Sequence, residues 1–179
     1  MPSVEWKDAA ADPVVLVLMG VSSCGKSTIA TLLSGRLGWP FEEGDALHPQ
    51  ADVDKMAAGH PLTDEDRWPW LEKVAEWIEE RLDVGENGIV TCSALKRSYR
   101  DLLNRRASGI VFVYLAGDEQ TIAARLAGRH GHFMPASLLP SQFADLEEPG
   151  SDEPAIRVDI RPAPDVIAQQ IVDELGLKD

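Results

Sequence analysis

The pattern that most constrains the fold of this chain is a glycine-rich stretch at residues 20–27. It reads Gly-Val-Ser-Ser-Cys-Gly-Lys-Ser and directly follows the apolar run Val14–Met19. Its glycines allow a tight turn in which successive backbone N–H groups point into one concavity and hold phosphate oxygens. Lys26 is expected to reach the β- and γ-phosphates, and the hydroxyl of Ser27 to ligate Mg²⁺. With a buried strand before it and a helix after it, the pattern predicts a phosphate-binding loop for a nucleoside triphosphate.

Apolar and polar segments alternate along the rest of the chain in a regular order of strands and helices. Strands are predicted at residues 14–19, 39–43, 89–92, 110–115 and 156–160. Helices are predicted at residues 26–37, 51–58, 64–84, 96–107, 119–128, 137–146 and 164–175, the third of them capped by Thr63 and Asp66. Such alternation is typical of a parallel sheet covered on both faces. We expect a flexible leader at residues 1–13 and a single three-layer α/β/α domain with a five-stranded sheet at residues 14–179.

The composition limits which partners the chain can have. Its 30 acidic and 17 basic residues give a net charge of −13, which argues against a nucleic-acid partner and against an anionic membrane surface. The longest strongly apolar run, Val14–Met19, is far shorter than the roughly 20 residues of a membrane helix. The first residues lack the basic and then apolar pattern of a secretory signal, so a cytoplasmic location is expected.

Polar residues beyond the carboxyl ends of the strands are the candidate site, because open parallel sheets bind their ligands there. Asp45 and His48 follow the second predicted strand. Asp45 could take the proton of an attacking hydroxyl or hold a metal-bound water; a simple turn or cap role is the alternative. Lys96, Arg97 and Arg100 lie in the first turns of a helix, where cations oppose the helix dipole. This placement indicates a pocket for a carboxylate or a phosphate, and the alternative, expected for at least one of the three, is a solvated basic face.

Two arginines, Arg125 and Arg129, are four residues apart and therefore share one helical face. With Gly128 and Gly131 beside them, they indicate a mobile lid at roughly residues 125–137 that brings guanidinium groups onto the nucleotide. Phosphate transfer needs such closure, because water would otherwise compete as the acceptor. The predicted ATP contacts are Gly20, Val21, Ser22, Ser23, Cys24, Gly25, Lys26, Ser27, Thr28 and Arg125.

Longer stretches at residues 19–28, 43–49, 55–56, 59–71, 92–103, 131–133 and 142–150 carry more specific elements than the phosphate loop. Among these elements are Gly-Asp-x-x-His-Pro, Cys-Ser-Ala-Leu-Lys and Leu-Glu-x-Pro-Gly. On these stretches the chain resembles the gluconate kinases of the thermoresistant type, over nearly its whole length after the leader. Cys24 departs from the small serine or glycine of many relatives, and since the loop uses the backbone N–H of this residue, binding is expected to survive.

The resemblance implies a P-loop kinase fold, ATP and Mg²⁺ as cofactors, and transfer of phosphate from ATP to the 6-hydroxyl of D-gluconate. It also implies a cytoplasmic homodimer that acts in gluconate catabolism. Lys26, Asp45, Arg125 and Arg129 would then be catalytic, and Mg²⁺ would be held by Ser27, with Asp45 as base or as a ligand through water. The expected contacts of the sugar acid are Asp45, His48, Arg67, Lys96, Arg100, His132 and Gln142.

Three alternative functions remain open at this stage. Shikimate or another small hydroxy acid is the nearest rival acceptor, although the Gly-Asp-Ala-Leu-His-Pro run speaks against it. A nucleotide-dependent switch would need an Asn-Lys-x-Asp base reader, which the sequence lacks. An inactive binding protein that kept the fold is disfavoured by the intact Lys26, Ser27 and Asp45.

Overall fold

Five parallel strands form the centre of the protein. The computed structural model describes residues 12–127 and 138–177. The strands lie side by side in the order β2-β3-β1-β4-β5, so that β1 is the middle of the sheet. Their bounds are β1 (Val15–Met19), β2 (Phe41–Glu43), β3 (Gly88–Thr91), β4 (Ile110–Ala116) and β5 (Ala155–Asp159).

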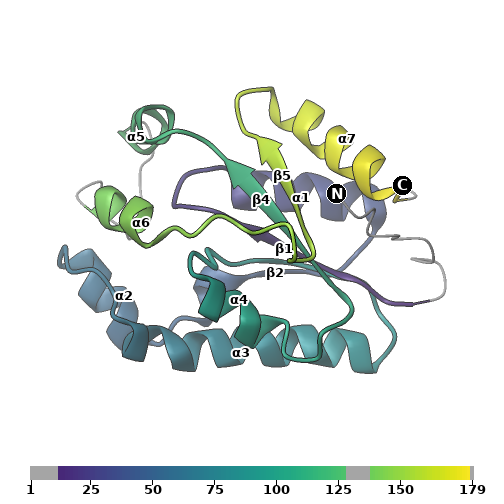
Figure 1. Cartoon of the computed structure of the whole chain (residues 1–179), viewed down its shortest axis with the longest axis horizontal. Coiled ribbons are helices and arrows are strands. Elements are labelled where there is room, and N and C mark those ends of the chain that lie inside the picture. Colours follow the sequence, from purple (N-terminus) through teal and green to yellow (C-terminus); the bar gives the residue numbers. More distant parts are fainter. Residues whose placement is uncertain (1–11, 128–137, 178–179) are drawn as a thin grey trace.

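Helices cover both faces of this sheet. Their bounds are α1 (Lys26–Leu37), α2 (Gln50–Ala57), α3 (Asp64–Asp83), α4 (Arg97–Leu103), α5 (Glu119–Ala127), α6 (Leu139–Asp145) and α7 (Pro164–Leu175), with a 3-10 turn, η1 (Gly44–Leu47), after β2. Helices α1 and α7 lie on one face and α3 and α4 on the other (Figure 1). The three-layer α/β/α fold predicted from the sequence is thus confirmed. Helix α4 is shorter than predicted, because the chain turns at residues 104–109 before β4.

The core is divided by the sheet into two hydrophobic clusters. All five residues of β1 are buried, and they alternate between the two faces: Leu16 and Leu18 pack with α1 and α7, while Val15, Val17 and Met19 pack with α3 and α4. Burying one such side chain contributes roughly 1.5–3 kcal/mol, so this strand is held firmly from both sides. The loop that follows β1 therefore starts from a rigid base.

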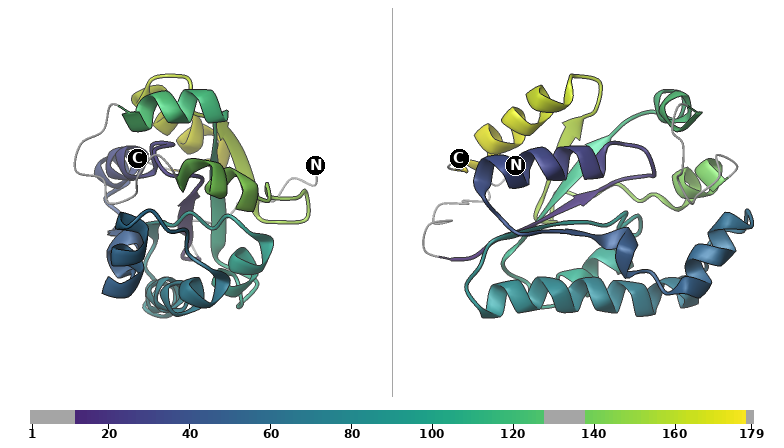
Figure 2. Two further views of the ribbon diagram at one scale, coloured as in Figure 1. Left: turned by 90° about the vertical axis from the view of Figure 1, so that its left-hand side faces the viewer. Right: turned by 180° about the vertical axis from the view of Figure 1, so that it is seen from behind.

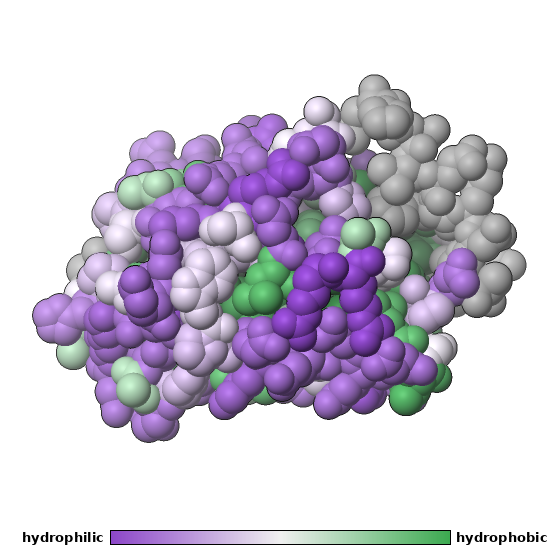
Figure 3. Space-filling model, turned by 60° about the horizontal axis from the view of Figure 1, so that its bottom comes forward, coloured by the Kyte–Doolittle hydropathy of each residue, from purple (hydrophilic) through white to green (hydrophobic). Residues whose placement is uncertain are grey.

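Helix α3 begins with the capping box that the sequence predicts. The Thr63 side chain accepts a hydrogen bond from the Asp66 N–H, and the Asp66 carboxylate accepts one from the Thr63 N–H. The outer side of α3 and α4 is mostly hydrophilic (Figure 3). Ion pairs there join Arg105 to Glu72 and Glu79, which fastens the turn after α4 to α3.

Helices α2, α5 and α6 gather at the carboxyl end of the strands. They lie at the left of Figure 1 and, seen from behind, at the right of the right-hand view in Figure 2. This is the end at which an open parallel sheet binds its ligands. None of the helices in the described ranges has the length and apolar character needed to cross a membrane.

Candidate active site

The glycine-rich stretch forms a loop between β1 and α1, as predicted. Gly20 has a φ of +142°, and a Cβ there would lie 2.9 Å from the carbonyl oxygen of Leu115, so a side chain would be strained and crowded. The ammonium of Lys26 donates to the carbonyl oxygens of Gly20 and Val21, both at 3.0 Å. The lysine charge is thereby held against the loop.

The remaining loop residues divide into a buried and an exposed group. Val21, Ser22, Ser23 and Cys24 are buried, whereas Ser27 and Thr28 are exposed in the first turn of α1. The thiol of Cys24 packs into the core cluster on the α1 face, as expected for a residue that offers the loop only its backbone. The positive end of the α1 dipole and the exposed hydroxyls of its first turn meet at this point, which suits an anion.

Asp45 is positioned by its neighbour Gly44. A Cβ on Gly44 would lie 1.7 Å from the carbonyl oxygen of Thr91, so the turn can approach β3 only with glycine at this position. The Gly44 N–H donates to the Thr91 hydroxyl at 3.1 Å, and the Gly44 carbonyl accepts from the Trp70 indole at 2.8 Å. Asp45 is thus on a fixed backbone, and its side chain is 40% exposed at the strand end.

His48 lies behind Asp45, and its side chain is 4% exposed. Its ring stacks on Trp70 with a centroid distance of 4.0 Å, and its Nδ1 is 3.4 Å from the buried carboxylate of Asp52. Burial lowers the pKa of His48, against the opposing effect of Asp45 and Asp52. His48 therefore packs behind Asp45 and supports its position.

Lys96 and Arg67, predicted as contacts of an anion, meet in one polar cluster. Asp64 accepts hydrogen bonds from Lys96, at 3.1 Å, and from the hydroxyl of Tyr99. The guanidinium of Arg67 donates to Tyr99 at 2.8 Å and to Asp145 at 3.0 Å. These five residues, Asp64, Arg67, Lys96, Tyr99 and Asp145, are called the acceptor cluster below.

The charges of the acceptor cluster are fixed by its hydrogen bonds. Hydrogen bonds from Tyr99 and Lys96 lower the pKa of Asp64, and the hydrogen bond to Asp64 raises the pKa of Lys96. Burial opposes the charge on Arg67, but its contacts with Tyr99 and Asp145 raise its pKa. Both cations are therefore charged at neutral pH, as the binding of a carboxylate requires.

Arg100 does not join this cluster, contrary to the prediction that it contacts the sugar acid. Its side chain is 1% exposed and pairs with Glu153 at 2.6 Å, and it donates to the carbonyl oxygens of Ala94 and Leu95. A guanidinium enclosed in this way fastens the loop before β5 to α4. Arg97 is likewise bound to Asp152, on the outer surface.

Gln142 contacts the phosphate loop. Its side-chain oxygen accepts a hydrogen bond from the N–H of Ser22 at 2.7 Å, across 120 positions of sequence. The sequence predicts Gln142 as a contact of the sugar acid, and that role stays a prediction. The structure adds that α6 is a neighbour of the phosphate loop as well as of Arg67, which it contacts through Asp145.

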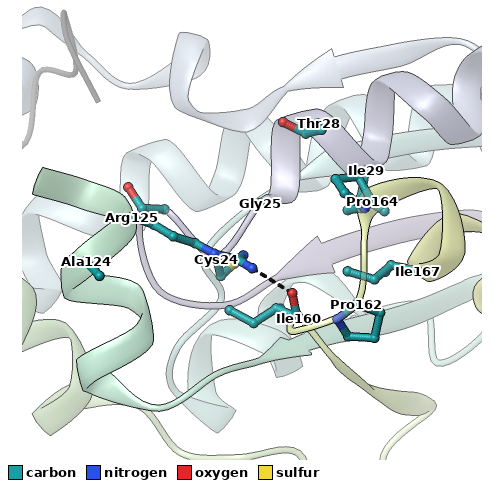
Figure 4. A pocket seen from close by; sticks show the side chains of 11 residues that line it. Cys24, Gly25, Thr28, Ile29, Ala124, Arg125, Ile160, Pro162, Pro164 and Ile167 are labelled. Atoms are coloured by element: carbon teal, nitrogen blue, oxygen red, sulfur yellow. Dashed lines mark hydrogen bonds between the residues drawn. The ribbon is translucent and has the colours of Figure 1, made fainter. Parts of the chain in front are cut away.

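A pocket of about 470 Å³ lies against the phosphate loop, on the side away from the acceptor cluster. Its walls come from the loop and α1, from α5, and from the segment between β5 and α7 (Figure 4). The guanidinium of Arg125 lies over it and donates to the carbonyl of Ile160 at 2.8 Å. Ile160, Pro162 and Ile167 give it an apolar wall that fits a flat base beside the phosphate site.

Sequence reasoning missed these apolar residues and the partners of the acceptor cluster. In a sequence, apolar residues after a strand cannot be told from core residues. The rule that ligands bind beyond the carboxyl ends of the strands was therefore used to select polar residues only. Applied to β5 without that filter, the rule would have found Ile160 and Pro162. Two predicted residues, Arg129 and His132, lie outside the described residues, as does most of the lid.

The donors present fit a magnesium ion held chiefly by phosphates. Within residues 12–127 and 138–177, no three His, Cys, Asp or Glu side chains gather closely enough to hold a metal ion. The exposed Ser27 hydroxyl in the first turn of α1 and the exposed Asp45 carboxylate in η1 are the candidate oxygen ligands. Mg²⁺ in nucleotide sites commonly takes one or two protein ligands, with phosphates and water completing its shell.

Comparison with known proteins shows the family of the chain. The shikimate kinase family model matches residues 22–148, and with the parallel sheet and the phosphate loop this match makes the chain a P-loop kinase of that group. A gluconokinase of Gluconobacter oxydans (strain 621H) is 52% identical over 93% of this chain and 94% of its own length. The thermoresistant gluconokinase of Escherichia coli (strain K12) is 42% identical, over 89% and 93%. The chain belongs to the gluconokinase family, as its motifs predict.

A solved structure supports the same assignment. The crystal structure of a gluconokinase from Sinorhizobium meliloti 1021 is 45% identical to this chain and covers 92% of each, with a TM-score of 0.81. The two chains therefore share one fold over most of their length.

Proposed function

We propose that this protein is a gluconokinase that transfers the γ-phosphate of ATP to the 6-hydroxyl of D-gluconate. The observation that carries the proposal is the presence of two different subsites that both meet the phosphate loop. A pocket under Arg125 with an apolar wall is lined by residues of the loop, and the acceptor cluster with its two cations is joined to the loop through α6. A nucleotide and a small hydroxylated anion are the pair of substrates that such a site suits.

In the proposed reaction the O6 atom of gluconate attacks the γ-phosphorus while the bond from that phosphorus to the bridging oxygen breaks. ADP leaves with the bonding electrons, and the hydroxyl proton passes to the carboxylate of Asp45. Lys26 and Arg125, joined by Arg129, balance the charge on the transferring group. The rigid backbone around Gly44 holds Asp45 in place for this role.

Mg²⁺ would be held by Ser27 and the ATP phosphates, with Asp45 through water as the alternative to its role as base. When bound, the ion neutralises charge on the phosphates. Ser27 suits this role because its hydroxyl is exposed in the first turn of α1.

Recognition of the sugar acid is assigned to the acceptor cluster and its surroundings. Lys96 and Arg67 would bind the carboxylate, and the hydroxyls would contact Asp45, His132 and Gln142, with His48 supporting Asp45 from behind. The carboxylate of gluconate matches the two cations that the cluster holds charged. We further propose a cytoplasmic homodimer, which rests on the family resemblance alone.

Measurement of ADP release with gluconate, shikimate and close analogues of gluconate tests the proposal. We expect gluconate-dependent turnover and little with shikimate, and absence of turnover with gluconate would refute the function. Shikimate is included because the shikimate kinase family model matches the chain.

Replacement of Lys96 by alanine tests the assignment of the carboxylate. Lys96→Ala is expected to raise the KM for gluconate by about tenfold or more, in line with the roughly 1.5–3 kcal/mol of a hydrogen bond to a charged group, and to leave the KM for ATP close to that of the wild type. Arg97→Ala is the matched control, since it removes the next cation of the chain, which is bound to Asp152 on the surface. Equal effects of Lys96→Ala on both KM values would remove Lys96 from this role.

A further inference from the structure

Helix α6 contacts both halves of the site. Gln142 accepts a hydrogen bond from the Ser22 N–H of the phosphate loop, and Asp145, three residues later, accepts one from Arg67 of the acceptor cluster. Residues three apart lie on the same side of a helix. One side of a seven-residue helix therefore connects the phosphate loop with the residues assigned to the sugar acid.

Asp145 accepts a hydrogen bond from the Arg67 guanidinium, and a substrate carboxylate bound to Arg67 would use the same donor. The Arg67 side chain is 9% exposed and its Nη1 is 3.0 Å from the Asp145 carboxylate, which is itself 29% exposed. Two carboxylates that meet the same guanidinium edge compete for its donors and repel each other. A substrate that brings its own carboxylate to Arg67 is thus opposed by Asp145.

Helix α6 is held less firmly than the helices that cover the sheet. Leu139 is the one buried residue within α6, and Phe143 is partly buried against the core. Just before the helix, Leu138 packs with Met56 and Leu62 in a small cluster that is separate from both main clusters. Among the described residues α6 thus has few buried contacts, and an element of this kind shifts at a lower cost in free energy than a core helix.

We propose that Asp145 is an internal competitor of the substrate carboxylate at Arg67, and that α6 couples this competition to the phosphate loop through Gln142. A nucleotide that draws the Ser22 N–H toward its phosphates weakens the hold of Gln142 and frees α6. Asp145 then leaves Arg67 at a lower cost, and the sugar acid binds more tightly. Since coupling is reciprocal, the sugar acid raises the affinity for the nucleotide by the same factor.

This inference rests on the proposed function, because it takes gluconate as the ligand of Arg67. It is tested by calorimetric titration of gluconate into the full-length protein, with and without saturating Mg²⁺ and a non-hydrolysable ATP analogue with a β,γ-imido bridge. For the wild type we expect gluconate to bind about fivefold or more tightly in the presence of the analogue, in the usual range of coupling factors.

The decisive variant is Asp145→Asn, which keeps the shape of the side chain and removes its charge. We expect gluconate to bind it more tightly than the wild type in the absence of the analogue, so that the ratio of the two dissociation constants falls toward one. Weaker binding, as from the loss of a substrate contact or of structural support, would overturn the inference, and so would a ratio unchanged from the wild type. Gln142→Ala is the second variant, and its ratio is also expected to fall.

Asp152→Asn is the matched control, since it removes one carboxylate from the surface ion pair with Arg97 and leaves Arg67 untouched. It should keep the wild-type ratio. Failure of the two proposals can be told apart. A wild type without gluconate turnover removes the proposed function, whereas a wild type that turns over gluconate with equal affinities in both titrations removes the coupling alone.

Discussion

The indole nitrogen of Trp70 donates a hydrogen bond to the backbone carbonyl of Gly44 at 2.8 Å. Trp70 is buried in α3, whereas Gly44 begins the turn that carries Asp45. The long helix on one face of the sheet is thereby attached to the backbone next to the proposed base. The position of Asp45 depends on this attachment and on the close approach of Gly44 to β3.

Gly44→Ala is expected to lower both stability and turnover. Its Cβ would overlap the carbonyl oxygen of Thr91, a backbone atom that cannot turn away, so the turn must move. Overpacking of this kind costs about 1–3 kcal/mol. We expect a lower free energy of unfolding in denaturant titration, together with a fall in kcat from the displaced Asp45.

Gly35→Ala is the control for that substitution. Gly35 lies inside α1, and a Cβ there would meet no atom within 4 Å. Alanine in a helix interior is favoured over glycine by about 0.5–1 kcal/mol, so this variant should be slightly more stable, with kcat unchanged. Equal destabilisation by the two alanines would contradict the role of Gly44.

Arg100→Leu separates a structural role from a role in substrate binding. The guanidinium of Arg100 and the carboxylate of Glu153 are both buried, and removal of one partner leaves the other charge uncompensated. Breaking such a pair costs about 3–5 kcal/mol, so we expect a marked loss of thermal stability. The KM for gluconate, measured well below the melting temperature, should stay within about twofold of the wild type. A large rise in that KM without loss of stability would return Arg100 to the substrate site.

Arg125→Ala is expected to act on the nucleotide. The side chain lies over the apolar pocket and donates to Ile160, so its loss opens that side of the pocket (Figure 4). A charge-assisted contact of roughly 1.5 kcal/mol corresponds to about a tenfold rise in the KM for ATP. The KM for gluconate should change much less, and steady-state kinetics with each substrate varied in turn measures both. A rise confined to gluconate would contradict the assignment of the pocket.

Acid is expected to remove the contribution of the Lys55–Asp66 pair to stability. The hydrogen bond from Lys55 lowers the pKa of Asp66 from 3.8 to about 2, aided by the cap of α3. A carboxyl group with a lowered pKa in the folded state stabilises that state above its ordinary pKa, and the effect is lost as the pH falls through the lowered value. The stability difference between wild type and Asp66→Asn should therefore be full above about pH 5 and shrink between about pH 4 and pH 2. Melting curves across this range measure it, and a difference independent of pH would contradict the pairing.

Local patterns predicted most of the fold and the position of the phosphate loop. The apolar run Val14–Met19, the glycine-rich loop and the Thr63–Asp66 box are contiguous signals, and each forms the element expected of it. Partners distant in sequence were not accessible in this way. A basic residue early in a helix gives the same sequence pattern whether its partner is a ligand or a distant carboxylate. The partner of Arg100 is a carboxylate 53 positions later. The contact between Gln142 and Ser22 leaves no local trace either.

The strand order β2-β3-β1-β4-β5 places most of the proposed acceptor residues on one side of β1 and most of the proposed nucleotide residues on the other. Strands on one side of β1 lead to Asp45 and Lys96, and those on the other lead to Arg125 and Ile160. On the proposed coupling, an exchange of one phosphate acceptor for another through changes on the first side would also shift the affinity for the nucleotide, because α6 joins the two sides through Gln142 and Asp145. A chimera with residues 41–103 taken from a relative with a different acceptor preference would test that exchange in the laboratory.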